Sequence, residues 1–112
     1  MNKAPITTHI LNLDTGKPAK GVSVTLHCLD TQKEIGRALT DDDGRILQWN
    51  KTFELEPGHY KLKFAVGLWY EQQSLTNFYP EIQLIVRVVN AQEHYHVPLL
   101  LNAYGYSTYR GS

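Results

Sequence analysis

Val22-Ser23-Val24-Thr25-Leu26-His27-Cys28 is the stretch whose pattern decides the fold. Apolar residues occupy every second position, and successive side chains of a β-strand point to opposite faces. The stretch therefore predicts a strand with one buried face and one solvated face, on which His27 would lie. Similar alternation marks further candidate strands at residues 6–13, 34–40, 52–55, 60–66, 82–88, 94–101 and 104–109.

Turn-forming residues separate these segments, for example Asp, Gly and Pro within residues 14–18 and Asp and Gly within 41–44. One segment departs from the alternation. Between residues 68 and 79, Leu68, Gln72, Leu75 and Tyr79 are near helical spacing, and Pro80 disfavours helix at the residue before it. We therefore predict an all-β fold, a β-sandwich of about eight strands with one short helix, in a single domain covering residues 1–112.

Composition limits the classes of function. Among the 112 residues, Lys and Arg together number 11, and Asp and Glu together also number 11, so the formal net charge is zero. This balance predicts no nucleic-acid partner, and the short apolar runs predict no membrane partner. Cys28 is the single cysteine, which excludes an intrachain disulfide and every multi-cysteine zinc pattern. No leader pattern precedes the first strand, so we expect a cytoplasmic protein, or a periplasmic one if Met1 replaces a removed leader.

The five histidines are the candidate chemical groups. His94 and His96 would share one face of a strand about 7 Å apart. His9 is a third candidate, on the face of its strand that Leu11 and Leu13 share. Three interpretations remain open for the pair: a zinc site, an acid–base pair, or a polar strand face, and no acidic partner is visible nearby. The remaining two, His27 and His59, are expected to be solvated.

Pro98 and its neighbours indicate contact beyond a simple sandwich. Proline cannot donate to a strand ladder, so Pro98 predicts an edge strand, a bulge or a close subunit contact. Leu11, Pro98 and Leu100 would leave apolar side chains on the face that a monomer exposes. Self-association is the simplest way to cover them.

Two C-terminal motifs carry a family resemblance. Residues 94–101, His-Tyr-His-Val-Pro-Leu-Leu-Leu, and residues 104–112, Tyr-Gly-Tyr-Ser-Thr-Tyr-Arg-Gly-Ser, resemble the 5-hydroxyisourate hydrolase family, the transthyretin-like branch whose chains end in Tyr-Arg-Gly-Ser. Shorter matches follow in family order at residues 8–12, 15–19, 43–45 and 78–82. The resemblance implies a transthyretin-like sandwich of two four-stranded sheets and one short helix. It also implies a homotetramer with active sites where subunits meet.

The resemblance further implies hydrolysis of 5-hydroxyisourate to 2-oxo-4-hydroxy-4-carboxy-5-ureidoimidazoline in urate degradation, with no cofactor and no metal. A histidine would take a proton from the attacking water, and an arginine would hold the anionic substrate. Either His9 or His96 could be the base. The alternative is a transthyretin-type carrier of a small ligand without catalysis. The implied catalytic residues are His9, Arg45, His96 and Ser112, and the implied substrate-binding residues are Tyr109, Arg110 and Gly111.

Overall fold

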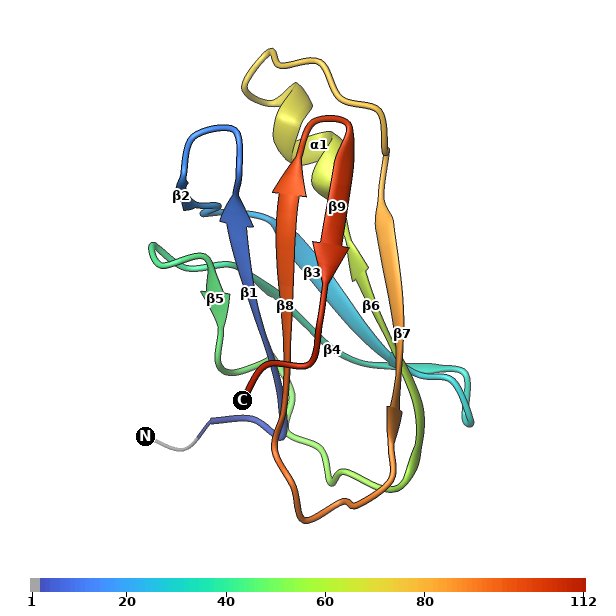
Figure 1. The fold of residues 1–112 in the computed structure, drawn as a ribbon. Helices are drawn as coiled ribbons and strands as arrows, with labels where there is room; N and C mark the ends of the chain where they lie inside the picture. The colour runs from blue at the N-terminus through green and yellow to red at the C-terminus, as the bar shows by residue number, and fades with distance from the viewer. Residues whose placement is uncertain (1–2) are drawn as a thin grey trace.

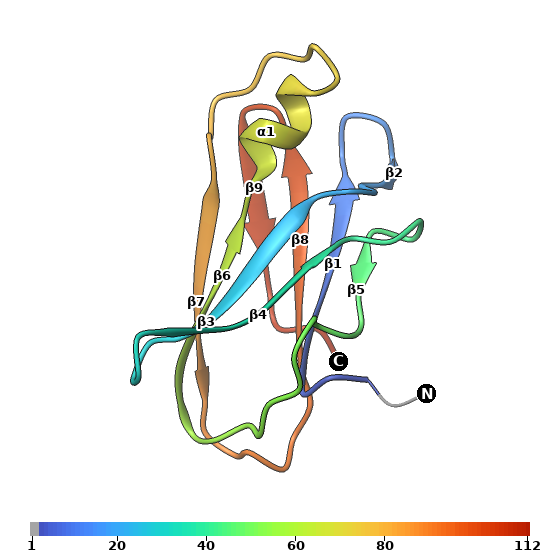
Figure 2. The ribbon, with the colours of Figure 1, turned by 180° about the vertical axis from the view of Figure 1, so that it is seen from behind.

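Two β-sheets face each other in the computed structural model, which describes residues 3–112. The first sheet has the order β2-β1-β8-β9, with β5 also paired to β1; its strands are β1 (Ile6–Asn12), β2 (Lys17–Pro18), β5 (Arg45–Ile46), β8 (Tyr95–Asn102) and β9 (Gly105–Thr108). The second sheet has the order β4-β3-β6-β7; its strands are β3 (Ser23–Cys28), β4 (Lys33–Leu39), β6 (Gly58–Phe64) and β7 (Ile82–Val88). Figures 1 and 2 show the sheets from opposite sides.

The predicted fold class, an all-β sandwich with one short helix, is confirmed. The resemblance implied two four-stranded sheets, whereas the first sheet here has five strands. The difference comes from short pairings along β1, because β2 and β5 are only two residues long. The alternation in residues 22–28 has the predicted orientation, since Val22, Val24 and Leu26 are fully buried.

The central pair of the first sheet, β1 and β8, is parallel, with Thr7 opposite His96 and His9 opposite Pro98. Its inner face belongs to the core, where Ile6, Ile10 and Leu99 are fully buried. Thr7 and His9 lie on the other face, because side chains alternate along a strand. This alternation separates the packing side of the sheet from the side that carries the histidines.

The predicted helix exists, but its position and buried face differ from the prediction. Helix α1 spans Val66–Glu71 and buries Val66, Gly67 and Tyr70, whereas Leu68 and Leu75 are about half exposed. Gly67 lies against the loop that returns to β7, because its N–H donates to the Pro80 carbonyl at 3.0 Å. The helix is thus fixed by this close approach and by Tyr70. No helix among residues 3–112 is long and apolar enough to cross a membrane.

Two further expectations are wrong. Residues 52–55 form no strand; Phe53 and Leu55 are partly buried against the core, but the segment pairs with no neighbouring strand. His27 is half-buried because it lies on the interior strand β3, opposite Glu34 on β4 and Lys61 on β6. Its Nδ1 is buried without a hydrogen-bond partner, and burial lowers the pKa of this imidazole.

Pro98 lies in an interior strand, so the edge-strand alternative is wrong. The β8–β9 register pairs Leu99 with Thr108, and a further bridge pairs His96 with Gly111. Between these two points the ladder is interrupted, because Pro98 has no N–H to donate. Its carbonyl instead accepts a hydrogen bond from the Thr108 hydroxyl at 2.7 Å. Pro98 is also buried within the single chain, so it adds no apolar surface for a partner.

Candidate active site

Three strands bring the predicted catalytic side chains to the outer face of the first sheet. In the β1–β5 pairing His9 lies opposite Arg45, and in the β1–β8 pairing Thr7 lies opposite His96. Thr7 and His9 are two residues apart on one strand, so they share a face with the residues opposite them. The register therefore gathers His9, Arg45 and His96 within a few strand spacings, although they come from distant parts of the sequence.

Thr7 connects His96 on β8 with His94, which lies just before that strand. Its Oγ1 lies 2.7 Å from Nδ1 of His96 and 3.0 Å from Nε2 of His94. Thr7 itself is 1% exposed, whereas His94 is exposed and His96 is half-buried. His94 and His96 do lie on the same side of the sheet, as predicted, and the group between them is a neutral hydroxyl.

The C-terminal segment runs along β8 and returns to this face. The N–H of Gly111 donates to the carbonyl of His96 at 2.8 Å. Ser112 thereby reaches a small cavity of about 80 Å³. The cavity is lined by Lys3, Thr7, Arg45, Leu47, His94, His96 and Ser112. Of the predicted catalytic residues, Arg45, His96 and Ser112 line one cavity, and His9 lies beside it, paired with Arg45.

Burial and neighbouring charges lower the pKa of both candidate histidines, which favours the neutral form. Burial is the main cause that lowers the pKa of His96, and the positive charge of Arg45 lowers it further. The same two causes, in the same order, lower the pKa of His9, while a backbone hydrogen bond with Asp43 partly opposes them. A neutral imidazole has a free lone pair that can accept a proton. Both histidines are therefore suited to act as bases at neutral pH.

The three predicted substrate-binding residues occupy different surroundings. Tyr109 is 59% exposed. The Arg110 guanidinium lies 4.4 Å from the centre of the Tyr95 ring and donates to Glu93 Oε1 at 2.9 Å and to the His94 carbonyl at 3.2 Å. These contacts hold the C-terminal segment against β8, and the Arg110 side chain lies among them instead of lining the small cavity.

Gly111 lies against the His96 ring. A Cβ atom at position 111 would come within 2.6 Å of His96 Cδ2 and 3.2 Å of Pro98 Cγ. Real Cβ atoms do not approach other atoms so closely, so a larger residue would push the imidazole away. His96 is thus enclosed between Gly111 on one side and Thr7 on the other.

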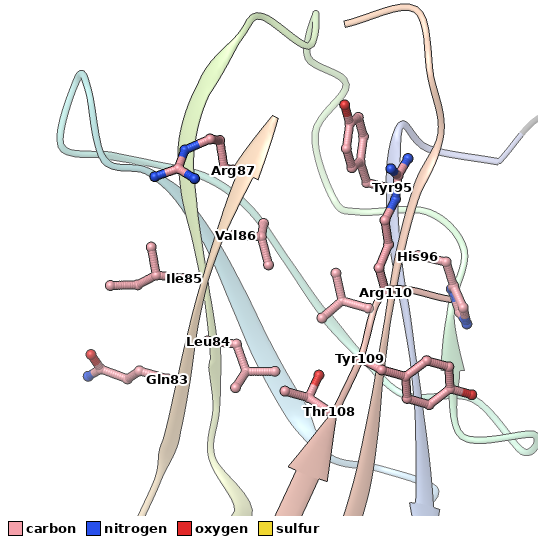
Figure 3. A pocket seen from close by; sticks show the side chains of 11 residues that line it. Gln83, Leu84, Ile85, Val86, Arg87, Tyr95, His96, Thr108, Tyr109 and Arg110 are labelled. Atoms are coloured by element: carbon pink, nitrogen blue, oxygen red, sulfur yellow. The ribbon is translucent and has the colours of Figure 1, made fainter. Parts of the chain in front are cut away.

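A larger pocket of about 360 Å³ lies on the other side of β8. Figure 3 shows Leu84 and Val86 pointing from β7 toward the C-terminal segment, while His96 points away. The walls contributed by β7 are mainly apolar, and the pocket opens at the side of the sandwich where β7 and β9 are the terminal strands of their sheets. His96, Tyr109 and Arg110 also line this pocket, so it adjoins the histidine cluster, although the His96 ring points away from it.

The sequence analysis did not identify Lys3, Thr7 and Leu47 as members of the site. It also did not predict that Thr7 would link two histidines. The Thr-Thr-His sequence of residues 7–9 gave a partial signal, since alternation places Thr7 on the same face as His9. The parallel pairing with β8 could not be read from it. Within residues 3–112, no three His, Cys, Asp or Glu side chains are grouped so that they could hold a metal ion.

Comparison with known proteins identifies the class. A family model described as the HIUase/Transthyretin family matches residues 6–111, and the chain belongs to this family. A Schizosaccharomyces pombe protein described as a probable 5-hydroxyisourate hydrolase is 42% identical, with 96% of this chain and 90% of that protein covered. The 5-hydroxyisourate hydrolase of Salmonella dublin is 45% identical, with 96% and 80% covered. These relatives confirm the family resemblance seen in the sequence.

Solved structures agree with this assignment. The structure of Klebsiella pneumoniae 5-hydroxyisourate hydrolase matches with a TM-score of 0.85 and 32% identity, covering 96% of this chain and 98% of that chain. Sea bream transthyretin in complex with thyroxine matches with a TM-score of 0.87 and 23% identity, covering 96% and 95%. At that identity the transthyretin match shows a shared fold and nothing about chemistry.

Proposed function

We propose that this chain hydrolyses 5-hydroxyisourate to 2-oxo-4-hydroxy-4-carboxy-5-ureidoimidazoline, in the degradation of urate. The observation that carries the proposal is the grouping of His96, Arg45 and Ser112 around one cavity with His9 beside it. The relatives described as 5-hydroxyisourate hydrolases support it, since they match over nearly the whole chain.

The proposed chemical step begins with a water molecule beside His96. The imidazole takes a proton from the water at Nε2, and the resulting hydroxide attacks the carbonyl carbon of the ring amide. General-base assistance of this kind typically contributes about 10²–10⁴-fold in rate. His9 is the second titratable group of the site, placed to donate or accept a proton as the intermediate collapses.

Arg45 supplies the fixed positive charge of the proposed site. The guanidinium is positively charged and presents paired N–H donors, which suit the oxygens of an anionic heterocycle. The same donors would stabilise the negative oxygen that forms when hydroxide adds to the carbonyl. The C–N bond then breaks, the nitrogen takes a proton, and the ring opens with the gain of one water. No metal and no cofactor take part in this proposal.

The C-terminal segment would place Ser112 and shape the cavity. Arg110 holds the segment through Glu93 and the Tyr95 ring, and Gly111 allows it to pass close to His96. The Ser112 side chain can then orient substrate or pass a proton. Tyr109, which is largely exposed, is proposed to contact substrate or a neighbouring subunit.

We further propose a homotetramer with active sites where subunits meet. A cavity of about 80 Å³ is small beside the roughly 300–1,000 Å³ typical of ligand sites, so a second copy would complete the walls. Leu13 is 47% exposed at the end of β1, and Leu11 and Leu100 are half-buried on the same outer face. Light scattering at micromolar concentration should give the mass of four chains, and a stable monomer would contradict this assembly.

The test of the activity is a product analysis. Freshly prepared 5-hydroxyisourate is mixed with the protein, with and without a chelator, and the products are identified by mass spectrometry. The proposal predicts rapid conversion to a species that has gained one water, at the same rate in both samples. A transthyretin-type carrier would bind the compound and leave its mass unchanged. Activity that chelation removes and zinc restores would contradict the metal-free reaction.

A further inference from the structure

Thr7 is placed to control the protonation of His96. Its hydroxyl lies between two imidazole nitrogens, Nδ1 of His96 at 2.7 Å and Nε2 of His94 at 3.0 Å. Both distances are those of real hydrogen bonds, and the threonine is 1% exposed. The three side chains therefore form a short chain of hydrogen bonds from the edge of the cavity to His96.

The hydroxyl of threonine has one proton to donate, and its oxygen can accept. When both imidazoles are neutral, Thr7 donates to one of them and accepts an N–H from the other. The tautomers of His94 and His96 are consequently coupled. In one arrangement His96 carries its proton on Nδ1 and leaves Nε2 free; in the other Nε2 is protonated and cannot act as a base.

We propose that Thr7 and His94 are positioning residues that hold His96 in the tautomer with Nδ1 protonated, so that Nε2 is free to take the proton from water. This inference rests on the proposed function, because the base role requires a free Nε2. Nδ1–H then donates to Thr7 Oγ1, and the Thr7 hydroxyl donates to Nε2 of His94. When His96 becomes an imidazolium, its Nδ1–H keeps the same partner, so no rearrangement is needed.

The proposed direction requires a neutral His94. Burial, and then the positive charge of Lys3, lower the pKa of His94, which favours a neutral ring that can accept the Thr7 proton. A protonated His94 would donate to Thr7, and Thr7 would then donate to His96 Nδ1, which gives the wrong tautomer.

His96 itself faces several charged or titratable groups. Burial is the largest cause that lowers the pKa of His96. Four neighbouring groups lower it further, namely Arg45, His9, His94 and Lys3. The imidazole is held in place as well, because Gly111 lies against Cδ2 on the side away from Thr7. The hydrogen-bond chain thus acts on a ring whose orientation is already fixed.

Thr8 provides a matched control on the same strand. It is fully buried, and its hydroxyl donates to the Val97 carbonyl of β8 at 2.6 Å on the core side. Thr7→Val and Thr8→Val therefore each replace a buried hydroxyl that is bonded to β8 by a methyl group of similar shape. Only the first of them removes a contact with an imidazole.

The experiment combines kinetics with the nitrogen chemical shifts of the histidines. Thr7→Val is expected to lower kcat about 10- to 100-fold, by analogy with the loss seen when a partner that orients a metal-binding histidine is removed. Thr7→Ser should restore most of this loss, and His94→Ala should lower kcat less than Thr7→Val does. Thr8→Val should leave kcat and its pH profile unchanged while lowering thermal stability.

NMR gives a readout that does not depend on turnover. The wild-type protein is expected to show His96 protonated on Nδ1 above its pKa, and Thr7→Val should shift it toward the Nε2-protonated form. The inference is overturned if wild-type His96 is protonated on Nε2, or if Thr7→Val keeps both kcat and the tautomer. Equal loss of kcat in Thr8→Val would also overturn it. An inactive wild-type protein with the expected tautomer would count against the proposed function and leave the hydrogen-bond chain supported.

Discussion

The two faces of the β1–β8 pair differ in almost every property although they alternate along the same strands. The inner face is buried and mainly apolar, and its Ile6, Ile10 and Leu99 are fully buried. The outer face carries His9 and His96, which are only half-buried. Stability and chemistry are thus assigned to alternate residues of the same two strands. Substitutions on one face should affect folding, and substitutions on the other should affect turnover.

The largest effect is expected on the outer face. His96→Ala, His9→Ala and Arg45→Ala should each lower kcat/KM by about 10²–10⁴-fold, because each removes a group of the proposed chemical step. The unfolding temperature should change little, since none of the three fills the core. Steady-state kinetics and thermal unfolding of the same samples measure both quantities. His59→Ala is the control, because His59 is exposed. A loss there as large as in His96→Ala would show that the outer face of this sheet has no special role in turnover.

The inner face should give the opposite result. Leu99→Ala removes a fully buried side chain and should lower the free energy of unfolding by about 2–5 kcal/mol. The value of kcat, measured well below the unfolding temperature, should stay near that of the wild type. Denaturant unfolding and kinetics test this pair of outcomes. A Leu99→Ala protein that is stable but inactive would show that the two faces are not separable.

Gly111 tests how closely the C-terminal segment encloses His96. Gly111→Ala should lower kcat roughly tenfold, because its Cβ would displace the His96 ring, and a small misplacement of a catalytic group is costly. Gly105→Ala is the matched control. A Cβ at position 105 meets only Asn102 Oδ1, at 3.5 Å, so this variant should keep its activity. Equal activity of the two variants would remove Gly111 from the site.

The smallest expected effect is a shift in the pH dependence of activity when Arg45 is replaced. Arg45 lowers the pKa of both His9 and His96, because its positive charge disfavours the imidazolium form. In Arg45→Gln both pKa values should rise, and the fall in activity toward acid should begin at a higher pH than in the wild type. NMR titration of the histidine protons measures this directly. Unchanged pKa values in Arg45→Gln would mean that the guanidinium does not act on the histidines.

The sequence predicted the fold well where one strand's own pattern decides its burial. The alternation around Val24 and Leu26 is an example, and both are fully buried. The sequence prediction was wrong where neighbouring strands determine whether a segment pairs or a side chain is buried. Phe53 and Leu55 alternate like a strand but have no partner strand, and His27 is flanked by residues of β4 and β6 that its own strand does not reveal.

The candidate site was predictable only in part. His9, Arg45 and His96 came from the family resemblance, and the register shows why they lie together. Thr7 is separated from His94 by 87 positions in the sequence and from His96 by 89. These residues meet through the parallel pairing of β1 with β8, which no local sequence pattern predicts. Arg110 likewise contacts Glu93 and Tyr95 because the C-terminal segment folds back along β8.

The decisive measurement is the rate at which His96→Ala consumes freshly prepared 5-hydroxyisourate, compared with wild type and with spontaneous decay. The wild-type protein is expected to far exceed spontaneous decay, and His96→Ala is expected to be about 10²–10⁴-fold slower at an unchanged unfolding temperature. A wild-type protein that does not exceed spontaneous decay, or a His96→Ala protein as fast as wild type, would contradict the assignment of chemistry to the outer face.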